Sequence, residues 1–155
     1  MNTKSINIYK IFSAIFMIAV MVIIFMLSAQ NSNDSAETSG TLITWLDKLF
    51  ALGISQDVIR TAAHFCEYAG LGFSVINFLY AFRNTVSPFL AVVIAWGYAL
   101  TDEIHQIFVP GRAFQLIDLT VNFFGILLGI IVFALIILVT EIIKEGKLKK
   151  ERVEI

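Results

Sequence analysis

Four long apolar stretches divide the chain, and polar residues gather where these stretches end. A transmembrane helix needs about 20 predominantly apolar residues, and each stretch approaches or exceeds that length. The pattern therefore predicts an all-α integral membrane bundle of four transmembrane helices, forming a single domain over residues 1–155. The predicted helices cover Ile11–Leu27, Thr61–Phe82, Pro88–Phe108 and Ile117–Ile143.

The segment between the first two stretches has a different pattern. It begins with a polar loop, Ser28–Gly40, and continues with Leu42–Leu52, in which apolar residues recur at helical spacing. This spacing predicts a short amphipathic helix. Such a helix would either lie in the membrane interface, with Trp45 at the depth of the headgroups, or pack over the end of the bundle.

The composition agrees with a membrane protein. Of the 155 residues, 58% are hydrophobic and 15% are charged, whereas soluble domains carry about 25% charged residues. No basic patch outside the C-terminal tail points to nucleic acid as a partner. The single cysteine, Cys66, excludes an intrachain disulfide. It sits in an apolar run, so we expect it to be a small packed residue.

Lysine and arginine residues are distributed unevenly between the two predicted sides of the membrane. With four crossings, both termini share a side, which holds eight of the eleven basic residues; Lys48, Arg60 and Arg112 lie opposite. Because basic residues concentrate in cytoplasmic loops, we expect a multi-pass protein of the cell membrane with both termini in the cytoplasm.

This topology brings polar residues of all four helices to the outer end of the bundle. On the second helix they recur at helical spacing over Arg60–Tyr68 and form one stripe. On the third helix, Asp102, His105 and Gln106 form a second stripe, and Glu103 points off it. Ionisable residues in membrane segments are costly and mark functional sites. The converging side chains are Ser28, Gln30, Arg60, His64, Glu67, Tyr68, Asp102, Glu103, His105, Gln106, Arg112, Asp118 and Asn122.

The residue types predict acid–base chemistry beside an anion-binding group. Carboxylates in a poorly hydrated pocket act as general acids and bases, and these catalytic candidates are grouped with one histidine: Glu67, Asp102, Glu103 and His64. The guanidinium groups of Arg60 and Arg112 suit a phosphate or another anionic headgroup. The other expected substrate contacts are Tyr68, His105, Gln106, Asp118, Asn122, Ser28 and Gln30.

Other interpretations of these residues stay open. The polar stripe of the second helix could only fix the depth of that helix, and the acids could only neutralise the arginines. Three ligands of a zinc site are available in His64, Glu67 and His105, but no dense motif such as H-E-x-x-H is present. We therefore predict no metal site, and the sequence identifies no cofactor.

A further pattern concerns packing. Gly125 and Gly129 of the fourth stretch are four residues apart, which is typical of a helix face that a neighbouring helix approaches closely.

The polar motifs together resemble the VanZ-like family of small bacterial membrane proteins, over most of the chain. Phe114-Gln115 departs from the family pattern, in which we expect a small residue such as serine before Asp118. The resemblance implies an envelope protein associated with resistance to the glycopeptide teicoplanin. It rests on Ser28-Ala-Gln30, Arg60-Thr-Ala-Ala-His64-Phe-Cys-Glu67-Tyr68, Thr101-Asp102-Glu103-Ile-His105-Gln106, Pro110-Gly-Arg112 and Asp118-x-x-x-Asn122-x-x-Gly125.

Three functional hypotheses follow. In the first, an outward-facing polar pocket binds or modifies a membrane lipid or lipid-linked envelope component and so lowers susceptibility to glycopeptides. In the second, the same pocket belongs to a binding or accessory protein without turnover. The third, a small proton-coupled transporter, is disfavoured because no polar path crosses the inner half of any predicted helix.

Overall fold

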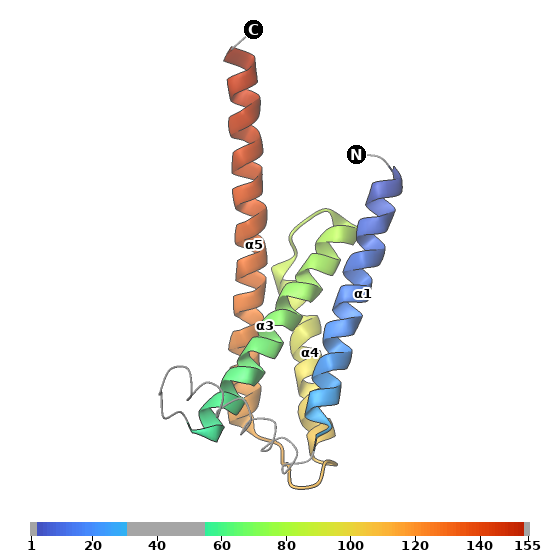
Figure 1. Ribbon diagram of the computed structural model, residues 1–155, viewed down its shortest axis with the longest axis vertical. Coiled ribbons are helices and arrows are strands. Elements are labelled where there is room, and N and C mark those ends of the chain that lie inside the picture. Colours follow the sequence, from blue (N-terminus) through green and yellow to red (C-terminus); the bar gives the residue numbers. More distant parts are fainter. Residues whose placement is uncertain (1–2, 31–54, 154–155) are drawn as a thin grey trace, which may run out of the picture.

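The computed structural model describes residues 3–30 and 55–153 of the chain. These residues form four helices and no strand: α1 (Thr3–Ser28), α3 (Gln56–Arg83), α4 (Pro88–Gln106) and α5 (Leu116–Val153). The helices run up and down along one long axis, and both termini lie at the same end (Figure 1). The predicted all-α bundle is therefore confirmed. The predicted amphipathic helix Leu42–Leu52, with Trp45 and Lys48, lies outside the described residues.

Three of these helices are long and apolar enough to cross a membrane: Ile8–Ser28, Val58–Arg83 and Leu116–Lys150. Their outward faces carry large exposed apolar side chains, among them Phe12 and Ile131, which water would disfavour and lipid accepts. The chain is thus a multi-pass membrane protein by helix length and composition. The third predicted span forms helix α4 as expected, but its last turns are polar, and its membrane crossing stays a prediction.

The helix ends follow local sequence signals. Ser55 caps α3, because its side chain accepts a hydrogen bond from the Val58 N–H at 3.4 Å. Asn84 ends the helix in the left-handed region, with φ 53°, and Pro88 opens α4. At the other end of α4, Gly111 has φ 76°, which glycine adopts without steric cost, and the chain turns back into α5.

Helix α3 is the centre of the bundle and packs against the other three helices. Its closest contact is with α5, where glycines let the two backbones approach each other. A Cβ built on Gly125 would lie 2.5 Å from the Phe65 carbonyl oxygen, and one on Gly129 would meet the Ala69 carbonyl oxygen. The predicted small-residue face is confirmed. Gly72 of α3, which the sequence pattern did not single out, approaches the α5 backbone in the same way.

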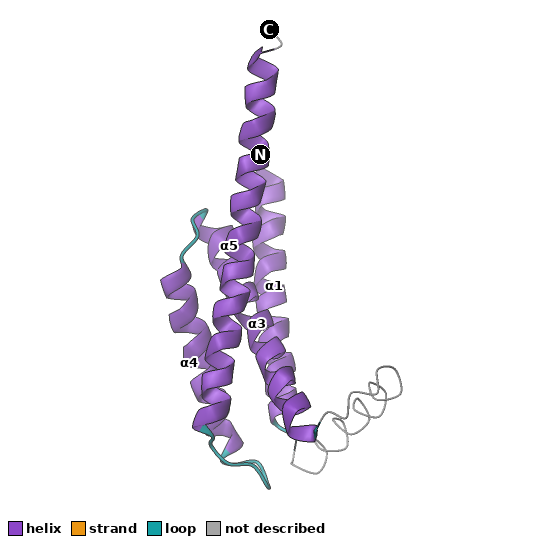
Figure 2. Ribbon diagram, turned by 90° about the vertical axis from the view of Figure 1, so that its left-hand side faces the viewer, coloured by secondary structure: helices purple, strands orange, loops and turns teal. Residues whose placement is uncertain are grey.

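Helix α4 buries a stripe of small residues that runs into the polar end of the molecule. Ala91, Ala95 and Ala99 are fully buried, and the same face continues into Asp102, Glu103 and Gln106. Figure 2 shows this helix beside α5, with which it also makes contacts. The apolar packing of α4 therefore fixes where its acidic side chains point.

Candidate functional site

The predicted site residues lie at the end of the bundle opposite the two termini. Ser28 ends α1 and Gln106 ends α4, whereas Arg60 and Asp118 lie in the first turns of α3 and α5. Figure 1 places these four helix ends together. The convergence that the sequence topology predicted is thus present in the fold.

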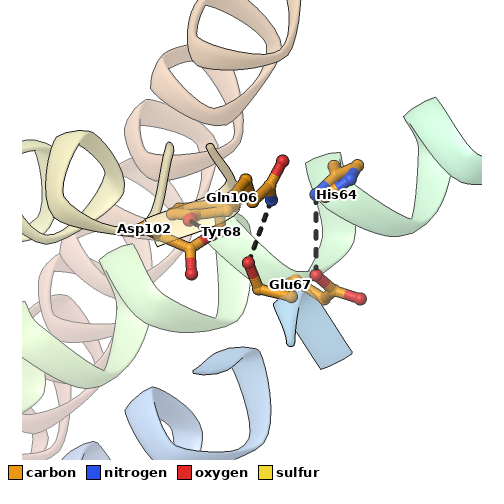
Figure 3. Close-up of polar contacts among 6 residues, drawn as sticks. His64, Glu67, Tyr68, Asp102 and Gln106 are labelled. Atoms are coloured by element: carbon orange, nitrogen blue, oxygen red, sulfur yellow. Dashed lines mark hydrogen bonds and ion pairs between the residues drawn. The ribbon is translucent and has the colours of Figure 1, made fainter. Parts of the chain in front are cut away.

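A buried hydrogen bond joins α3 to α4 at the centre of the site. The Tyr68 hydroxyl donates to Asp102 Oδ2 at 2.8 Å. Tyr68 is fully buried and Asp102 is 4% exposed, and Figure 3 shows both side chains between the two helices. A hydrogen bond inside a protein contributes about 0.5–1.5 kcal/mol, so this pair helps to fix the position of the Asp102 side chain.

Two more contacts tie the end of α1 to the rest of the site. The Gln106 side-chain amide donates to Ser28 Oγ at 3.0 Å. The Arg112 Nε–H donates to the backbone carbonyl of Gln30 at 3.1 Å. Gln30 therefore contributes its main chain to this contact, while Ser28 contributes its hydroxyl.

Glu103 is held at the start of α5. Its Oε2 accepts a hydrogen bond from the backbone N–H of Gln115 at 3.1 Å, directly before the helix begins. A helix N-terminus carries partial positive charge, which favours a carboxylate there. Glu103 is fully buried, although it points away from Asp102, which bonds to Tyr68 of α3. The alanine stripe explains the burial of Glu103, because Glu103 follows Ala99 by the same four-residue step that separates the buried alanines.

His105, which the sequence placed on the polar stripe of α4, contacts α1. Its side chain is half-buried and its ring packs against Phe25 of α1, with the centroids 4.7 Å apart. His64, by contrast, is buried, and its Nδ1 lies 3.8 Å from Glu67 Oε2 (Figure 3). Within the described residues, no three His, Cys, Asp or Glu side chains are arranged to hold a metal ion. The zinc alternative through His64, Glu67 and His105 therefore has no geometric support.

Several buried polar atoms of the site have no hydrogen-bond partner among the described residues. They include Asp102 Oδ1, Glu103 Oε1 and both side-chain polar atoms of Asn122, a residue with no exposed surface. Buried polar atoms in proteins are nearly always paired, and leaving one unpaired costs about 1–3 kcal/mol. Several unpaired buried polar atoms close together are expected where a ligand or water supplies the missing hydrogen bonds.

Of the two arginines, Arg112 has the hydrogen bond to the Gln30 carbonyl described above. Among the described residues, neither Arg60 nor Arg112 forms an ion pair with a carboxylate at 4.0 Å or less. Burial, and then the positive charge of nearby Arg60, lowers the pKa of Arg112. Two guanidinium groups that repel each other in a partly buried site favour an anion between them. The carboxylates of Asp102, Asp118 and Glu67 act on the pKa of Arg112 in the opposite direction, without direct ion pairs among the described residues.

A small polar cavity of about 40 Å³ lies beside the arginines. It holds a few water molecules at most. Arg60, Gln106, Arg112 and Asp118 were expected there. Its lining also includes Gly111, Ala113 and Gln115 of the connecting loop, which sequence reasoning missed; the Pro-Gly-Arg turn between two polar clusters was the available signal.

One expectation about the neighbouring surface is corrected by the structure. Cys66 is exposed instead of packed, because it lies on the side of α3 away from the buried polar stripe. Thr101, a hydroxyl in the same region, donates to the Tyr98 carbonyl at 2.7 Å and is thereby engaged with its own helix.

Comparison with known proteins gives one family. The model of the VanZ/LLP1 family matches residues 12–138, which include every polar residue of the site. No curated protein and no solved structure matches the chain.

Proposed function

Because the chain belongs to the VanZ/LLP1 family, we propose that its polar site faces outward from the cell membrane and serves the cell envelope. In this proposal the site binds, or chemically modifies, the anionic head of a lipid-linked envelope component. Occupation or turnover of that component lowers susceptibility to glycopeptides such as teicoplanin. The observation that carries the proposal is the pair of arginines, which form no direct ion pair within the described part of the chain, beside buried polar atoms that lack a hydrogen-bond partner there.

The arginines are the anion-binding groups. Arg60 and Arg112 line the same cavity, and a guanidinium group offers two parallel N–H donors that match a phosphate or carboxylate. Asn122 has an unpaired amide that both donates and accepts. It and the other contact residues would orient the head: Tyr68, His105, Gln106, Asp118, Ser28 and Gln30.

The acidic residues supply proton transfer if the bound component is turned over. Glu67 lies beside His64, and Asp102 is held by Tyr68; both act electrostatically on Arg112, which lines the cavity. Glu103 Oε1 has no partner and is available to a substrate proton. Positioned carboxylates of this kind contribute general acid or base catalysis. A binding protein without turnover would use the same residues only as hydrogen-bond acceptors.

The outward orientation follows from the basic residues. Both termini lie at the end opposite the site (Figure 1), and eight of the eleven basic residues belong to that end by sequence. The positive-inside rule then places the termini in the cytoplasm and the site at the outer leaflet. This orientation also requires α4 to cross the membrane as the fourth span.

The proposal is tested by three substitutions that change charge or donor geometry with little change in size. We expect Glu67→Gln, Asp102→Asn and Arg112→Lys each to abolish the effect of the protein on teicoplanin susceptibility. Membrane levels should stay near that of the wild type, because each substitution retains a polar side chain at its place.

Protein level and susceptibility are measured on the same cells. If the acids only neutralised buried arginines, breaking a pair would cost about 3–5 kcal/mol, and the level would fall together with the effect. A normal susceptibility effect in all three variants would refute the pocket.

A further inference from the structure

An apolar groove lies on the surface between α3 and α5, apart from the polar cavity. It has a volume of about 620 Å³, and apolar side chains dominate its lining. Two of them are well exposed: Val58 is 57% and Phe124 58% exposed. Thr61, Ala62 and Cys66 continue the α3 side of the groove, and Val121 completes the α5 side. A volume of this size is within the range of pockets that hold small ligands.

The groove lies at the same level of the bundle as the polar cavity. On α3, Thr61 of the groove directly follows Arg60 of the cavity. On α5, Val121 of the groove comes three residues after Asp118 of the cavity, a rise of about 4.5 Å along a helix. The same two helix segments thus carry an anion-binding side and an apolar side.

We propose that the groove holds the hydrocarbon chain of the lipid whose anionic head lies between Arg60 and Arg112. This inference rests on the proposed function and names the chemical class of the ligand: an amphiphile with a phosphate-type head and an apolar chain. The polar cavity, at about 40 Å³, has no room for a chain. The groove, at about 620 Å³, supplies an apolar surface for one, and charge and apolar contact then act on one molecule.

The test uses farnesyl phosphate, which has both parts, and dimethylallyl phosphate, which has the same head and a much shorter chain. Ala62→Phe fills the groove; Ala63→Phe is the matched control, because Ala63 is its exposed neighbour and does not line the groove. Affinities are measured on full-length protein in phosphatidylcholine nanodiscs. We expect the wild type to bind farnesyl phosphate more tightly than dimethylallyl phosphate. Ala62→Phe should lower the affinity for farnesyl phosphate by about tenfold, which is the effect of removing roughly two methylene groups from apolar contact.

The control variant and the shorter ligand show which results would overturn the proposal. Ala63→Phe should bind both phosphates as the wild type does, and Ala62→Phe should bind dimethylallyl phosphate normally. Equal wild-type affinity for the two phosphates overturns the groove assignment and leaves the proposed function intact. If the wild type binds neither phosphate, the anion site itself fails, and the proposed function fails with it.

A second measurement needs no substitution, because Cys66 is the single cysteine of the chain and lines the groove. In the wild type, a membrane-soluble maleimide should alkylate Cys66, and farnesyl phosphate should slow that reaction. Dimethylallyl phosphate and the uncharged alcohol farnesol should leave the rate unchanged. Equal slowing by farnesol would show general lipid coverage and overturn the proposal. So would a Cys66 that is unreactive without ligand, since another part of the chain or a second copy would then fill the groove.

Discussion

One added methyl group at Gly129 should separate α5 from α3. A Cβ there would meet the Ala69 carbonyl oxygen and lie 2.7 Å from the Phe73 backbone nitrogen. Both are backbone atoms of a helix, so neither can rotate away, and the two helices must move apart. Overpacking costs about 1–3 kcal/mol, and a clash with rigid backbone belongs at the upper end of that range.

The direction of the change in stability makes Gly129→Ala a sharp test of the close contact. Alanine is favoured over glycine in a helix interior by about 1 kcal/mol, so the net loss for Gly129→Ala is about 2 kcal/mol. Gly97 of α4 has no atom within 4 Å of an added Cβ, so Gly97→Ala should stabilise the protein by about 1 kcal/mol. For a chain of this size, 1 kcal/mol corresponds to about 2–4 °C in Tm.

Thermal melting in detergent measures both variants against the wild type. We expect Gly129→Ala to melt several degrees lower and Gly97→Ala slightly higher. The larger substitutions Gly125→Leu and Gly129→Leu should disrupt folding altogether. If Gly129→Ala melts at or above the wild-type temperature, the close α3–α5 contact is refuted.

Three further predictions concern topology and the buried polar groups. On a Cys66→Ala background, single cysteines at positions 48 and 112 should react in intact cells with an impermeant maleimide, and those at positions 4 and 150 should not; the reverse pattern would place the site at the inner leaflet. Asn122→Leu should raise Tm, because it removes unpaired buried atoms that cost about 1–3 kcal/mol, and should abolish the effect on teicoplanin susceptibility; a lower Tm would mean that the amide has a structural partner. Tyr68→Phe should lower Tm, because it removes the hydrogen bond that the Asp102 side chain accepts. An unchanged Tm would show that this bond contributes nothing to stability.

Helical spacing and membrane topology predicted the position of the site but not its bonding. The stripe from Arg60 to Tyr68 and the polar ends of the other helices do meet at one end of the bundle, because each helix is rigid and successive helices run in opposite directions (Figure 1). Spacing alone could not choose between Asp102 and Glu103 as the partner of Tyr68, since that choice depends on the rotation of α4. The buried alanines set this rotation, and His105 is consequently turned toward Phe25.

Hydrogen bonds to main-chain atoms could not be predicted from the sequence either. Arg112 bonds to the carbonyl of Gln30, and Glu103 to the N–H of Gln115; neither depends on the side chain of the partner, so residue types gave no signal. The groove between α3 and α5 was missed for a different reason. Most of its residues are ordinary apolar side chains, and their gathering into a hollow depends on how the two helices pack.

The central claim is that Arg60 and Arg112 bind the anionic head of a membrane lipid. Native mass spectrometry of the purified protein measures this most directly, with Arg112→Lys as the comparison, because lysine keeps the charge and loses the two-pronged geometry. We predict that the wild type retains a phosphate-bearing lipid through detergent exchange and that Arg112→Lys releases it. Retention of the same lipids in the same amounts by both proteins would contradict the claim.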